Sequence, residues 1–304
     1  MSEKQKVAVI GLGSIGLGMA QSLLRAGHRV VGVDVNDARR QAFIEAGGDA
    51  VSTSAEAAAD ADCVICVVVS AAQTEAVLFE SDGVADVMPE GSVFMSCATV
   101  PPAFAVKTAA RLESMNRHYL DAPTSGGPAK AATGEMTIMA SGTEAAFARA
   151  QAVLDACTSK VYRLGDKAGG GSAMKLINQL LAGVHIATAC EAMSLAIKLG
   201  LEPDQVYDVI THAAGSSWMF ENRVPHILAG DYQPKSAVNI FTKDLGIVLD
   251  TARAEDFPVP VAGAALQMYL MAAAAGMGQD DDTSVARVYA QLAGLQLPTG
   301  SEPK

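Results

Sequence analysis

Three polar side chains interrupt the apolar run GSAMKLINQLLAGVHIATACEAM (residues 171–193): Lys175, Asn178 and Gln179. A helix that is apolar nearly all round belongs in a core, where an ammonium is seldom fully buried without a partner. Positions i, i+3 and i+4 share one helix face, so the three side chains form a polar patch of the kind that faces a cavity. A lysine partly withdrawn from water suits proton transfer to and from an alcohol oxygen, and an asparagine can hold that oxygen. His185, two turns beyond Asn178, either reaches the same pocket or is a hydrogen-bonded core histidine.

A second chemical signal is the glycine-rich stretch VAVIGLGSIGLGMAQSLL, which begins at residue 7. Its three glycines follow a predicted strand and open a predicted helix, so the backbone can turn tightly and approach a pyrophosphate at the helix N-terminus. The residues expected to contact a dinucleotide there are Gly11, Leu12, Gly13, Ser14, Ile15 and Gly16.

The next strand-like run, RVVGVD, ends in Asp34, 18 residues after Gly16. A carboxylate at this place accepts hydrogen bonds from the ribose hydroxyls of NAD and repels a 2′-phosphate. We therefore expect NAD as the cofactor. Arg39 and Arg40 lie one turn further on, where they either hold the phosphate of NADP or are solvated.

A third signal is DAPTSGGPAKAATG, residues 121–134, which follows another strand-like run. Two glycines after a serine allow backbone N–H groups to converge on an anion, so Ser125, Gly126 and Gly127 are a candidate carboxylate site. The alternative is an ordinary hairpin loop.

The elements that must position these residues change in kind along the chain. Short β-rich runs alternate with helical segments in the first half, which predicts a parallel sheet with helices on both faces. After about residue 165 the strand-like runs end and helical patterns follow, at 168–198, 203–214, 244–255, 260–275 and 281–293, with 215–225 expected as a loop. The first of these helices would have about 30 residues and a length of roughly 45 Å. We predict an α/β domain at 1–166, an all-α domain at 167–296 and a flexible tail at 297–304.

The bulk composition excludes several classes of function. The net charge of −11 lacks the basic surface that nucleic acid requires. Half of the residues are hydrophobic, but no uninterrupted apolar stretch of membrane-spanning length and no signal peptide is expected, which indicates a cytoplasmic protein without a membrane partner. Five scattered cysteines indicate free thiols, and the C-x-x-C of Cys63 and Cys66 lies in a strand that points the two side chains to opposite faces. No cluster of metal ligands is found, so no metal is expected.

The motifs GLGSIG, DAPTSGGPAKAATG, GGGSAMKLIN and FTKDLGIVLD, in this order and spacing, resemble the β-hydroxyacid dehydrogenases, the family that includes 3-hydroxyisobutyrate dehydrogenase and tartronate semialdehyde reductase. The resemblance covers essentially the whole chain. It implies an N-terminal Rossmann domain and an all-helical C-terminal domain joined by the long helix, with the active site between the domains and assembly into dimers or tetramers.

The resemblance also implies residue roles. The family's catalytic lysine matches Lys175, its hydroxyl-positioning asparagine matches Asn178, and its carboxylate-binding Ser-Gly-Gly matches Ser125 to Gly127. The lysine of its K-D-L motif, which contacts cofactor and substrate, matches Lys243, with Asp244 beside it.

The cofactor loops provide one further match, and this chain differs from the family pattern at two places. Thr99 matches a threonine at the nicotinamide ribose, while Val68 and Val69 stand where the family usually has Leu-Pro. The family often has a second asparagine where this chain has Gln179, which is also a candidate substrate-binding residue.

The segments NQLLAGVHIA, GSSWMFENRVPHILAGDY and FTKDLGIVLDTA most resemble the L-threonate dehydrogenase branch, which implies oxidation of a four-carbon sugar acid with NAD. The alternatives are a tartronate semialdehyde reductase, a 3-hydroxyisobutyrate-type dehydrogenase or a non-catalytic nucleotide-binding module. Extra polar residues such as Ser216, Ser217 and Asn222 suit a polyhydroxylated acid, because a methyl-bearing substrate would leave them unpaired. Trp218 either covers the site, from this or a neighbouring subunit, or is a core indole that pins a surface loop.

Overall fold

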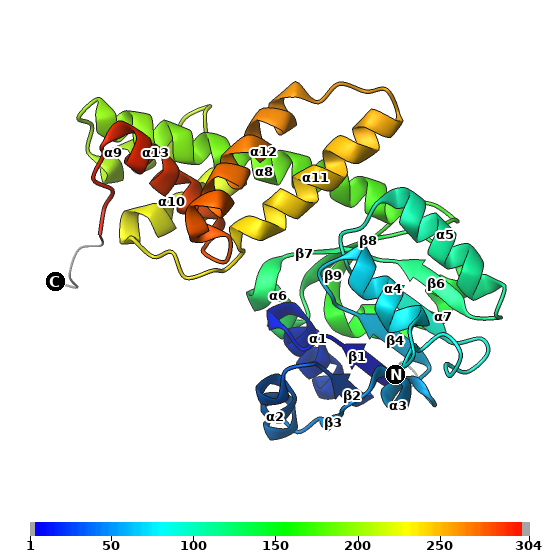
Figure 1. Ribbon diagram of the computed structural model, residues 1–304. Coiled ribbons are helices and arrows are strands. Elements are labelled where there is room, and N and C mark those ends of the chain that lie inside the picture. The colour runs from blue at the N-terminus through cyan, green and yellow to red at the C-terminus, as the bar shows by residue number, and fades with distance from the viewer. Residues whose placement is uncertain (1–3, 300–304) are drawn as a thin grey trace. The chain divides into compact units, whose positions relative to one another are not determined.

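The computed structural model describes residues 4–299 (Figure 1). The chain divides into two compact units, and the boundary in the sequence falls between Lys175 and Leu176. Five residues of the expected tail, 300–304, lie outside the described part. The change from mixed to all-helical elements comes after residue 163, close to the boundary expected near residue 166, and the compact units meet inside the long helix that follows.

The N-terminal unit is built on a six-stranded parallel sheet in the order β3-β2-β1-β4-β5-β6. Its strands are β1 Lys6–Ile10, β2 Arg29–Val33, β3 Asp49–Val51, β4 Cys63–Cys66, β5 Val93–Ser96 and β6 His118–Asp121. The chain order reverses between β1 and β4, which is the point where a doubly wound sheet binds its ligand. The predicted Rossmann architecture is thus confirmed.

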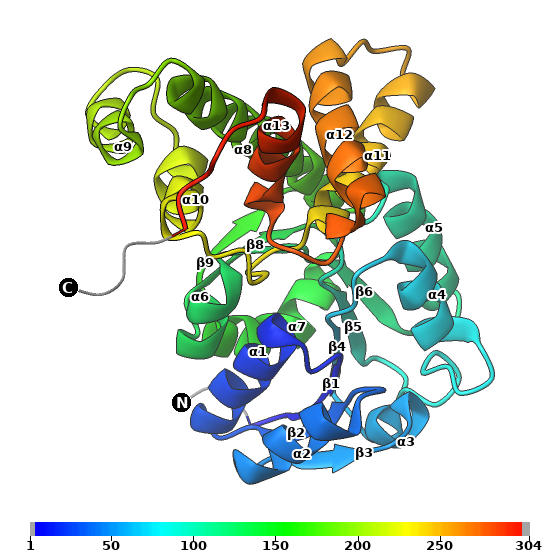
Figure 2. The ribbon, with the colours of Figure 1, turned by 60° about the vertical axis from the view of Figure 1, so that its left-hand side comes forward.

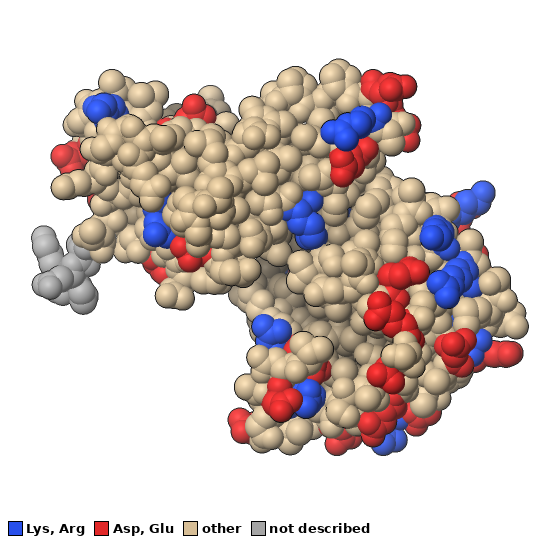
Figure 3. All heavy atoms as spheres, in the orientation of Figure 1, with Lys and Arg blue, Asp and Glu red and all other residues tan. Residues whose placement is uncertain are grey.

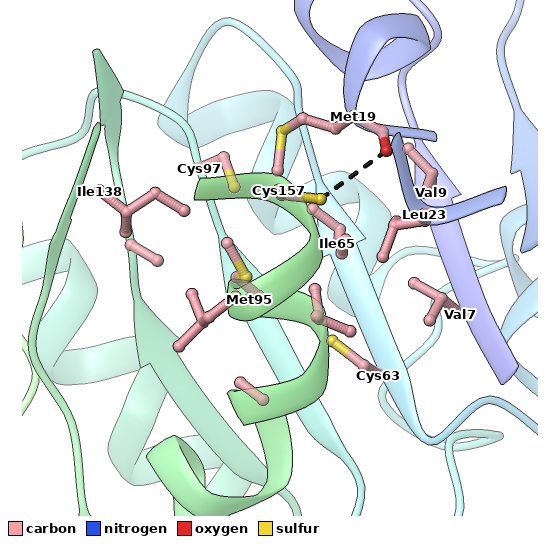
Figure 4. Packing of buried hydrophobic residues seen from close by; sticks show 14 of the residues in the cluster. Val7, Val9, Met19, Leu23, Cys63, Ile65, Met95, Cys97, Ile138 and Cys157 are labelled. Carbon is pink, nitrogen blue, oxygen red and sulfur yellow. Dashed lines mark hydrogen bonds between the residues drawn. The ribbon is translucent and has the colours of Figure 1, made fainter. Parts of the chain in front are cut away.

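Both faces of this sheet are buried, because each central strand carries apolar side chains in both directions. In β1, Val7 and Val9 enter one core cluster, and Ala8 and Ile10 enter the cluster on the opposite face. The first cluster packs against helices α1 Ser14–Arg25 and α7 Glu144–Cys157 (Figure 4). The second packs against α3 Ser54–Ala58, α4 Ala71–Phe79 and α5 Pro102–Glu113, and α2 Asp37–Glu45 lies between β2 and β3 in the chain.

The cysteines follow this two-sided burial. Cys63 lies in the cluster that includes Cys97 and Cys157, whereas Cys66 lies in the cluster on the other face, as the odd spacing within β4 predicts. All five cysteines are free and buried, and burial raises the pKa of each thiol. Within residues 4–299, no group of three or more His, Cys, Asp or Glu residues could hold a metal ion.

A second, three-stranded sheet was not foreseen. It has the order β7-β8-β9, with β7 Thr124–Ser125 antiparallel and β9 Thr158–Arg163 parallel to β8 Met136–Ala140. Helix α6 Gly127–Thr133 connects β7 to β8, and Figures 1 and 2 show it beside α1. A Cβ at Gly18 of α1 would lie 2.7 Å from the backbone nitrogen of Ala132, so glycine permits the two helices to approach this closely.

The C-terminal unit contains only helices in its described residues. They are α8 Gly170–Lys198, which begins in the first unit, α9 Pro203–Thr211, α10 Trp218–Ala229, α11 Val238–Ala254, α12 Pro260–Ala272, a π-helical turn Ala273–Met277, a 3-10 turn Asp282–Ser284 and α13 Val285–Ala293. Helix α11 begins six residues earlier than expected, because Val238 and Phe241 are buried together with Leu245 in one core cluster.

The expectation of a loop over 215–225 is wrong, because helix α10 starts at Trp218. Ser217 caps this helix by accepting a hydrogen bond from Phe220 N, 3.0 Å away. Pro225 lies inside the helix and lacks the N–H that would bond the carbonyl of Glu221, and the hydroxyl of Tyr207 donates to that carbonyl instead at 3.1 Å. The proline is therefore tolerated within the helix.

Two helical segments of the described chain, Gly170–Lys198 and Pro260–Met277, are long and apolar enough on average to cross a membrane. The sequence expectation concerned uninterrupted apolar stretches, and both segments contain polar residues, such as Lys175 and Gln267. The observation is weak evidence for a membrane span, because core helices pass the same test. Both segments supply side chains such as Ile186, Met193 and Tyr269 to the core of the C-terminal unit.

Candidate active site

The glycine-rich turn after β1 has the geometry expected of a pyrophosphate loop. Gly11 has φ +94°, and a Cβ there would lie 2.4 Å from the carbonyl oxygen of Val67. A Cβ at Gly16 would lie 1.8 Å from the carbonyl oxygen of Gly11. Both positions therefore require glycine for the fold of the turn itself.

Gly13 differs from these two glycines. It is the N-cap of α1 at φ −65°, and a Cβ there would meet nothing within 4 Å. The fold therefore does not explain this glycine, but the close approach of a phosphate group does. Ser14 and Ile15 form the first turn of α1, whose N–H groups and helix dipole attract an anion, so the loop fits a dinucleotide.

Replacing Gly13 with alanine separates cofactor binding from folding. The added methyl group has free space in the protein, so the melting temperature should stay unchanged, while the clash with a bound pyrophosphate should cost about 1–3 kcal/mol. This corresponds to a rise in the dissociation constant for NAD of roughly 10- to 100-fold, measured by calorimetric titration. Gly215→Ala, also at an open position, is the matched control. Unchanged NAD affinity in Gly13→Ala would contradict the assignment of the loop.

Asp34 lies directly behind this turn, at the end of β2. Its carboxylate accepts hydrogen bonds from the backbone N–H groups of Leu12 and Asn36, both at 2.8 Å. The side chain is nearly buried, and Arg39 Nη1 lies 3.4 Å from one of its oxygens. The sequence motif and its acidic partner are thus brought together in one unit.

The other expected cofactor residues follow the carboxyl ends of neighbouring strands. Val68 and Val69 come after β4, and Val69 N donates to Gln73 Oε1 at 2.8 Å. Thr99 comes three residues after the end of β5. Since β1, β4 and β5 are adjacent and parallel, these residues and the glycine-rich turn share one edge of the sheet.

The expected carboxylate loop is strained in the manner that favours glycine. Ser125 ends β7, and Gly126 and Gly127 then have φ values of +137° and +74°. A Cβ at Gly127 would meet nothing within 4 Å, so this side of the loop is open to a ligand.

Lys175 reaches the same loop. Its Nζ donates to the carbonyl oxygen of Thr124 at 2.9 Å, one residue before Ser125, although 51 residues separate the two partners in the chain. The side chain is half-buried. The predicted catalytic lysine and the predicted carboxylate site are therefore neighbours within the N-terminal unit.

Asp121, which the sequence reasoning did not single out, holds the start of α8. Its carboxylate accepts hydrogen bonds from Gly169 N at 3.0 Å, from Ser172 N at 2.8 Å, from Ser172 Oγ at 2.7 Å and from Ser141 Oγ at 3.2 Å. Burial raises the pKa of Asp121 above its ordinary value, and these hydrogen bonds oppose that shift. A signal was present in the sequence, since an acid ends a buried strand and GGGS opens the long helix.

The C-terminal unit holds the remaining candidates. Asn178 and Gln179 lie on α8, and Asn178 Nδ2 donates to Gln179 Oε1 at 2.9 Å. Lys243 lies on α11, and its Nζ is 2.5 Å from Oδ1 of Asp244. Because α8 is continuous from residue 170 to 198, Asn178 follows Lys175 by one turn on the same helix face.

The structure shows the surroundings of Trp218, Ser216, Ser217 and His185, for which the sequence left alternatives open. Trp218 is 67% exposed at the start of α10, so it is not the core indole of the second alternative. Ser216 donates to Glu221 Oε1 at 2.8 Å and Ser217 caps α10, so both hydroxyls serve local structure. His185 is half-buried on α8.

Comparison with known proteins now decides the family. Residues 6–165 match the model of the NAD-binding domain of 6-phosphogluconate dehydrogenase, and residues 169–289 match the NAD-binding domain of NADP-dependent 3-hydroxyisobutyrate dehydrogenase. The chain belongs to the 3-hydroxyisobutyrate dehydrogenase family of β-hydroxyacid dehydrogenases. The resemblance inferred from the four motifs is thus confirmed, as are the dehydrogenase class and the NAD-binding domain.

Individual members of this family are similar over nearly the full chain. The L-threonate dehydrogenase of Cupriavidus necator is 53% identical over 98% of this chain and 99% of its own length. The L-threonate dehydrogenase of Escherichia coli K12 is 48% identical over 96% of both chains. A crystal structure of 3-hydroxyisobutyrate dehydrogenase from Salmonella typhimurium has a TM-score of 0.89 at 52% identity and covers 93% of this chain and 99% of its own. These names agree on a dehydrogenase and differ in the acid.

Proposed function

We propose that this β-hydroxyacid dehydrogenase oxidises L-threonate with NAD to 2-dehydro-L-erythronate. The observation that carries the chemistry is the contact of Lys175 with Thr124 beside the Ser-Gly-Gly loop. The identity of 48–53% to two L-threonate dehydrogenases carries the choice of acid. In the balanced reaction, the carbinol carbon loses a hydride and its hydroxyl loses a proton, so the products are the oxo acid, NADH and one proton.

Each proposed role follows from what the residue can offer. Backbone N–H groups of Ser125, Gly126 and Gly127 bind the substrate carboxylate, since the two glycines adopt left-handed conformations that turn N–H groups toward an anion. Lys175, as the neutral amine, is the general base that takes the hydroxyl proton, and the ammonium formed by this transfer favours the developing alkoxide. Asn178 holds the reacting oxygen, and Lys243 contributes a second cation to cofactor and substrate binding.

The proposed cofactor residues are those of the glycine-rich turn together with Asp34, Val68, Val69 and Thr99. Bound NAD would supply the hydride acceptor. A buried carboxylate at Asp34 favours the ribose diol over a 2′-phosphate, which is the basis for NAD rather than NADP. Arg39 lies close enough to this carboxylate to form an ion pair with it, and so does not stand apart as a phosphate site.

A second candidate is a 3-hydroxyisobutyrate-type dehydrogenase, which the name of the similar Salmonella structure favours. The two candidates are separated by following nicotinamide absorbance with NAD and NADP against L-threonate, D-threonate, D-erythronate, D-glycerate and 3-hydroxyisobutyrate. NADH formation with L-threonate alone is the expected result. Turnover confined to 3-hydroxyisobutyrate would replace the proposed substrate and keep the family.

The proposed assembly is a homodimer or homotetramer formed through α8. Three large apolar side chains on this helix are about half exposed or more, namely Ile177 at 55%, Leu181 at 50% and Leu195 at 57%, and Leu199, one residue past the end of the helix, is 69% exposed. Ile177, Leu181 and Leu195 are spaced by four and fourteen residues, which places them at d, a and a of a heptad repeat and keeps one seam turned toward a partner helix. On the face of the molecule shown in Figure 3, charged side chains gather over the N-terminal unit, and much of the C-terminal unit is uncharged.

Introducing charge into this seam should dissociate the protein. We expect Leu181→Asp/Leu195→Asp to sediment as a monomer at concentrations where the unchanged protein is a dimer or tetramer, because each aspartate would be buried without a partner. Val106→Asp, at a side chain of α5 that is 52% exposed, is the control that should not change the mass. An unchanged protein that is already monomeric would refute the assembly.

The proposed location of the protein is the cytoplasm, where thiols stay reduced, and its five free cysteines support this.

A further inference from the structure

The proposed mechanism leaves the charge of the substrate carboxylate without a partner at the Ser-Gly-Gly loop. Lys175 acts there as the neutral amine, so it does not supply the charge that attracts an anion. Lys243 belongs to the C-terminal unit, and its Nζ already lies 2.5 Å from Oδ1 of Asp244. The chain as a whole has a net charge of −11, which repels an anionic substrate. A positive group beside the loop would therefore strengthen the binding of the acid.

Helix α6, which follows the loop directly, carries a lysine in its second turn. The helix runs from Gly127 to Thr133, and Gly126 is its N-cap. Side chains of an α-helix lean toward its N-terminus and lie over the residues three and four positions earlier. For Lys130 these positions are Gly127 and Gly126, the two glycines of the loop. The helix geometry therefore directs this lysine back toward the expected carboxylate site.

The surroundings of Gly126 show that the lysine side chain does lie over the loop. A Cβ built on Gly126 would be 3.1 Å from Cβ and 3.0 Å from Cδ of Lys130. The aliphatic part of the lysine thus covers one side of Gly126, and its ammonium group is two bonds beyond Cδ. A Cβ on Gly127 would meet nothing within 4 Å, so the neighbouring side of the loop stays open to a ligand.

The Lys130 ammonium has no competing carboxylate. Among residues 4–299, no Asp or Glu side chain forms an ion pair with Lys130, and its side chain is exposed. The nearest acid along the chain, Glu135, accepts a hydrogen bond from Thr133 Oγ1 at 3.0 Å. An anion at the loop can therefore pair with Lys130 without displacing a partner within the described part of the protein.

We propose that Lys130 is a substrate-binding residue, whose ammonium group pairs with the carboxylate of the hydroxy acid at the Ser-Gly-Gly loop. This inference rests on the proposed function, in which that loop binds the carboxylate. The backbone N–H groups direct the carboxylate, Lys130 supplies the opposite charge, and Lys175 acts on the hydroxyl group. Because the carboxylate does not change during the reaction, the ion pair stabilises the bound acid and the transition state equally and contributes to KM rather than kcat.

Replacing Lys130 with methionine keeps an unbranched side chain over the loop and removes the charge. The KM for L-threonate should rise about three- to tenfold with kcat nearly unchanged, because a uniform binding interaction is lost. Lys130→Arg should keep most of the affinity. Added sodium chloride should raise the KM of the unchanged protein more than that of Lys130→Met, since an exposed ion pair is screened by salt. Lys107→Met, at an exposed lysine of α5, is the control for the loss of one charge.

An uncharged analogue separates a charge interaction from mere support of the loop. L-Threonamide has the hydroxyl groups of L-threonate and no charge. Calorimetric titration of each compound into the protein with NADH measures binding without turnover, because the reduced cofactor cannot accept a hydride. In Lys130→Met the dissociation constant for L-threonate should rise about three- to tenfold, and that for the amide should stay the same. An equal rise for both compounds would overturn the proposal, as would an equal salt dependence of L-threonate binding in the two proteins.

The result for Lys130 is separable from the choice of acid. Every candidate acid has the carboxylate, so Lys130→Met should raise the KM of whichever acid is turned over. Turnover of 3-hydroxyisobutyrate alone, with the expected rise in its KM, would refute L-threonate as substrate and support the role of the lysine. Turnover of L-threonate with the same KM in Lys130→Met would refute that role and leave the proposed function standing. Failure of every acid to bind the complex with NADH would refute both.

Discussion

Replacing Lys175 with alanine should lower kcat for hydroxy-acid oxidation by about 10²–10⁴, the usual contribution of a positioned general base. The dissociation constant for NAD should change little, because the glycine-rich turn and Asp34 are held by contacts that do not involve this lysine. The loss should appear in kcat more than in KM, since the base acts on the proton that leaves during the reaction.

The position of Lys175 explains why the effect should be large. Its Nζ is 2.9 Å from the carbonyl oxygen of Thr124, so the amino group is already oriented toward the Ser-Gly-Gly loop before substrate binds. Lys107→Ala, an exposed lysine of α5 in the same unit, is the control for loss of one positive charge. Turnover retained in Lys175→Ala would remove the lysine from the reaction.

Replacing Asp121 with alanine should have the largest effect on stability. The carboxylate satisfies two backbone N–H groups and two hydroxyls in a buried site, and each donor left unpaired costs about 1–3 kcal/mol. A total loss of roughly 3–5 kcal/mol is expected, or about 2–4 °C of melting temperature for each kcal/mol. The start of α8 would also loosen, and a displacement of Lys175 by about 1 Å should cost roughly 10²-fold in kcat.

Asp121→Asn is the matched control. The asparagine oxygen can take the place of Oδ2, which accepts from Gly169 N, Ser172 N and Ser141 Oγ, and the hydroxyl of Ser172 can rotate to accept from its NH₂ group. Most of the stability and activity should therefore remain. Equal thermal stability of Asp121→Ala and the unchanged protein would show that the carboxylate does not anchor the helix.

The same pair of proteins gives a pH dependence with a defined sign. Burial raises the pKa of Asp121, so the folded state keeps this proton to a higher pH than the unfolded state does. The contribution of Asp121 to the free energy of unfolding therefore falls as pH rises from about 4 through the raised folded value. Urea unfolding across this range should show a smaller fall with pH for Asp121→Asn than for the unchanged protein. A steeper fall in the variant would contradict the direction of the shift.

Much of the fold could be predicted because its signals are local. The strands of the parallel sheet are short β-rich runs, and the order of β1, turn and α1 follows from the glycines alone. The three-stranded sheet was missed because Thr124–Ser125 has only two residues and β9 is mostly exposed, so neither shows a clear alternating pattern. Helix α10 was missed because Pro225 and the preceding Gly-Ser pair normally end helices, whereas Tyr207 compensates here from another helix.

In the candidate site, too, residues with a local signal could be predicted, and residues that depend on tertiary contacts could not. Residue types and helix spacing placed Lys175 and Asn178 on one face of α8, and the Lys175 contact with Thr124 agrees with that prediction. The supporting carboxylates could not be found from spacing, because the hydrogen-bond donors to Asp121 lie 20–51 residues away along the chain and the donor Gln179 lies 65 residues from Asp244. Gln179 lies on the predicted polar face of α8, but its hydrogen bond to Asp244 of α11 could not be predicted from the sequence.

The most direct test of the account is the reduction of NAD by L-threonate in purified protein, followed by nicotinamide absorbance with the oxo-acid product identified. We expect NADH formation with L-threonate, little or no reduction of NADP, and a loss of about 10²–10⁴ in kcat in Lys175→Ala. NADH formation from 3-hydroxyisobutyrate without any from L-threonate would contradict the proposed substrate, and undiminished turnover in Lys175→Ala would contradict the proposed mechanism.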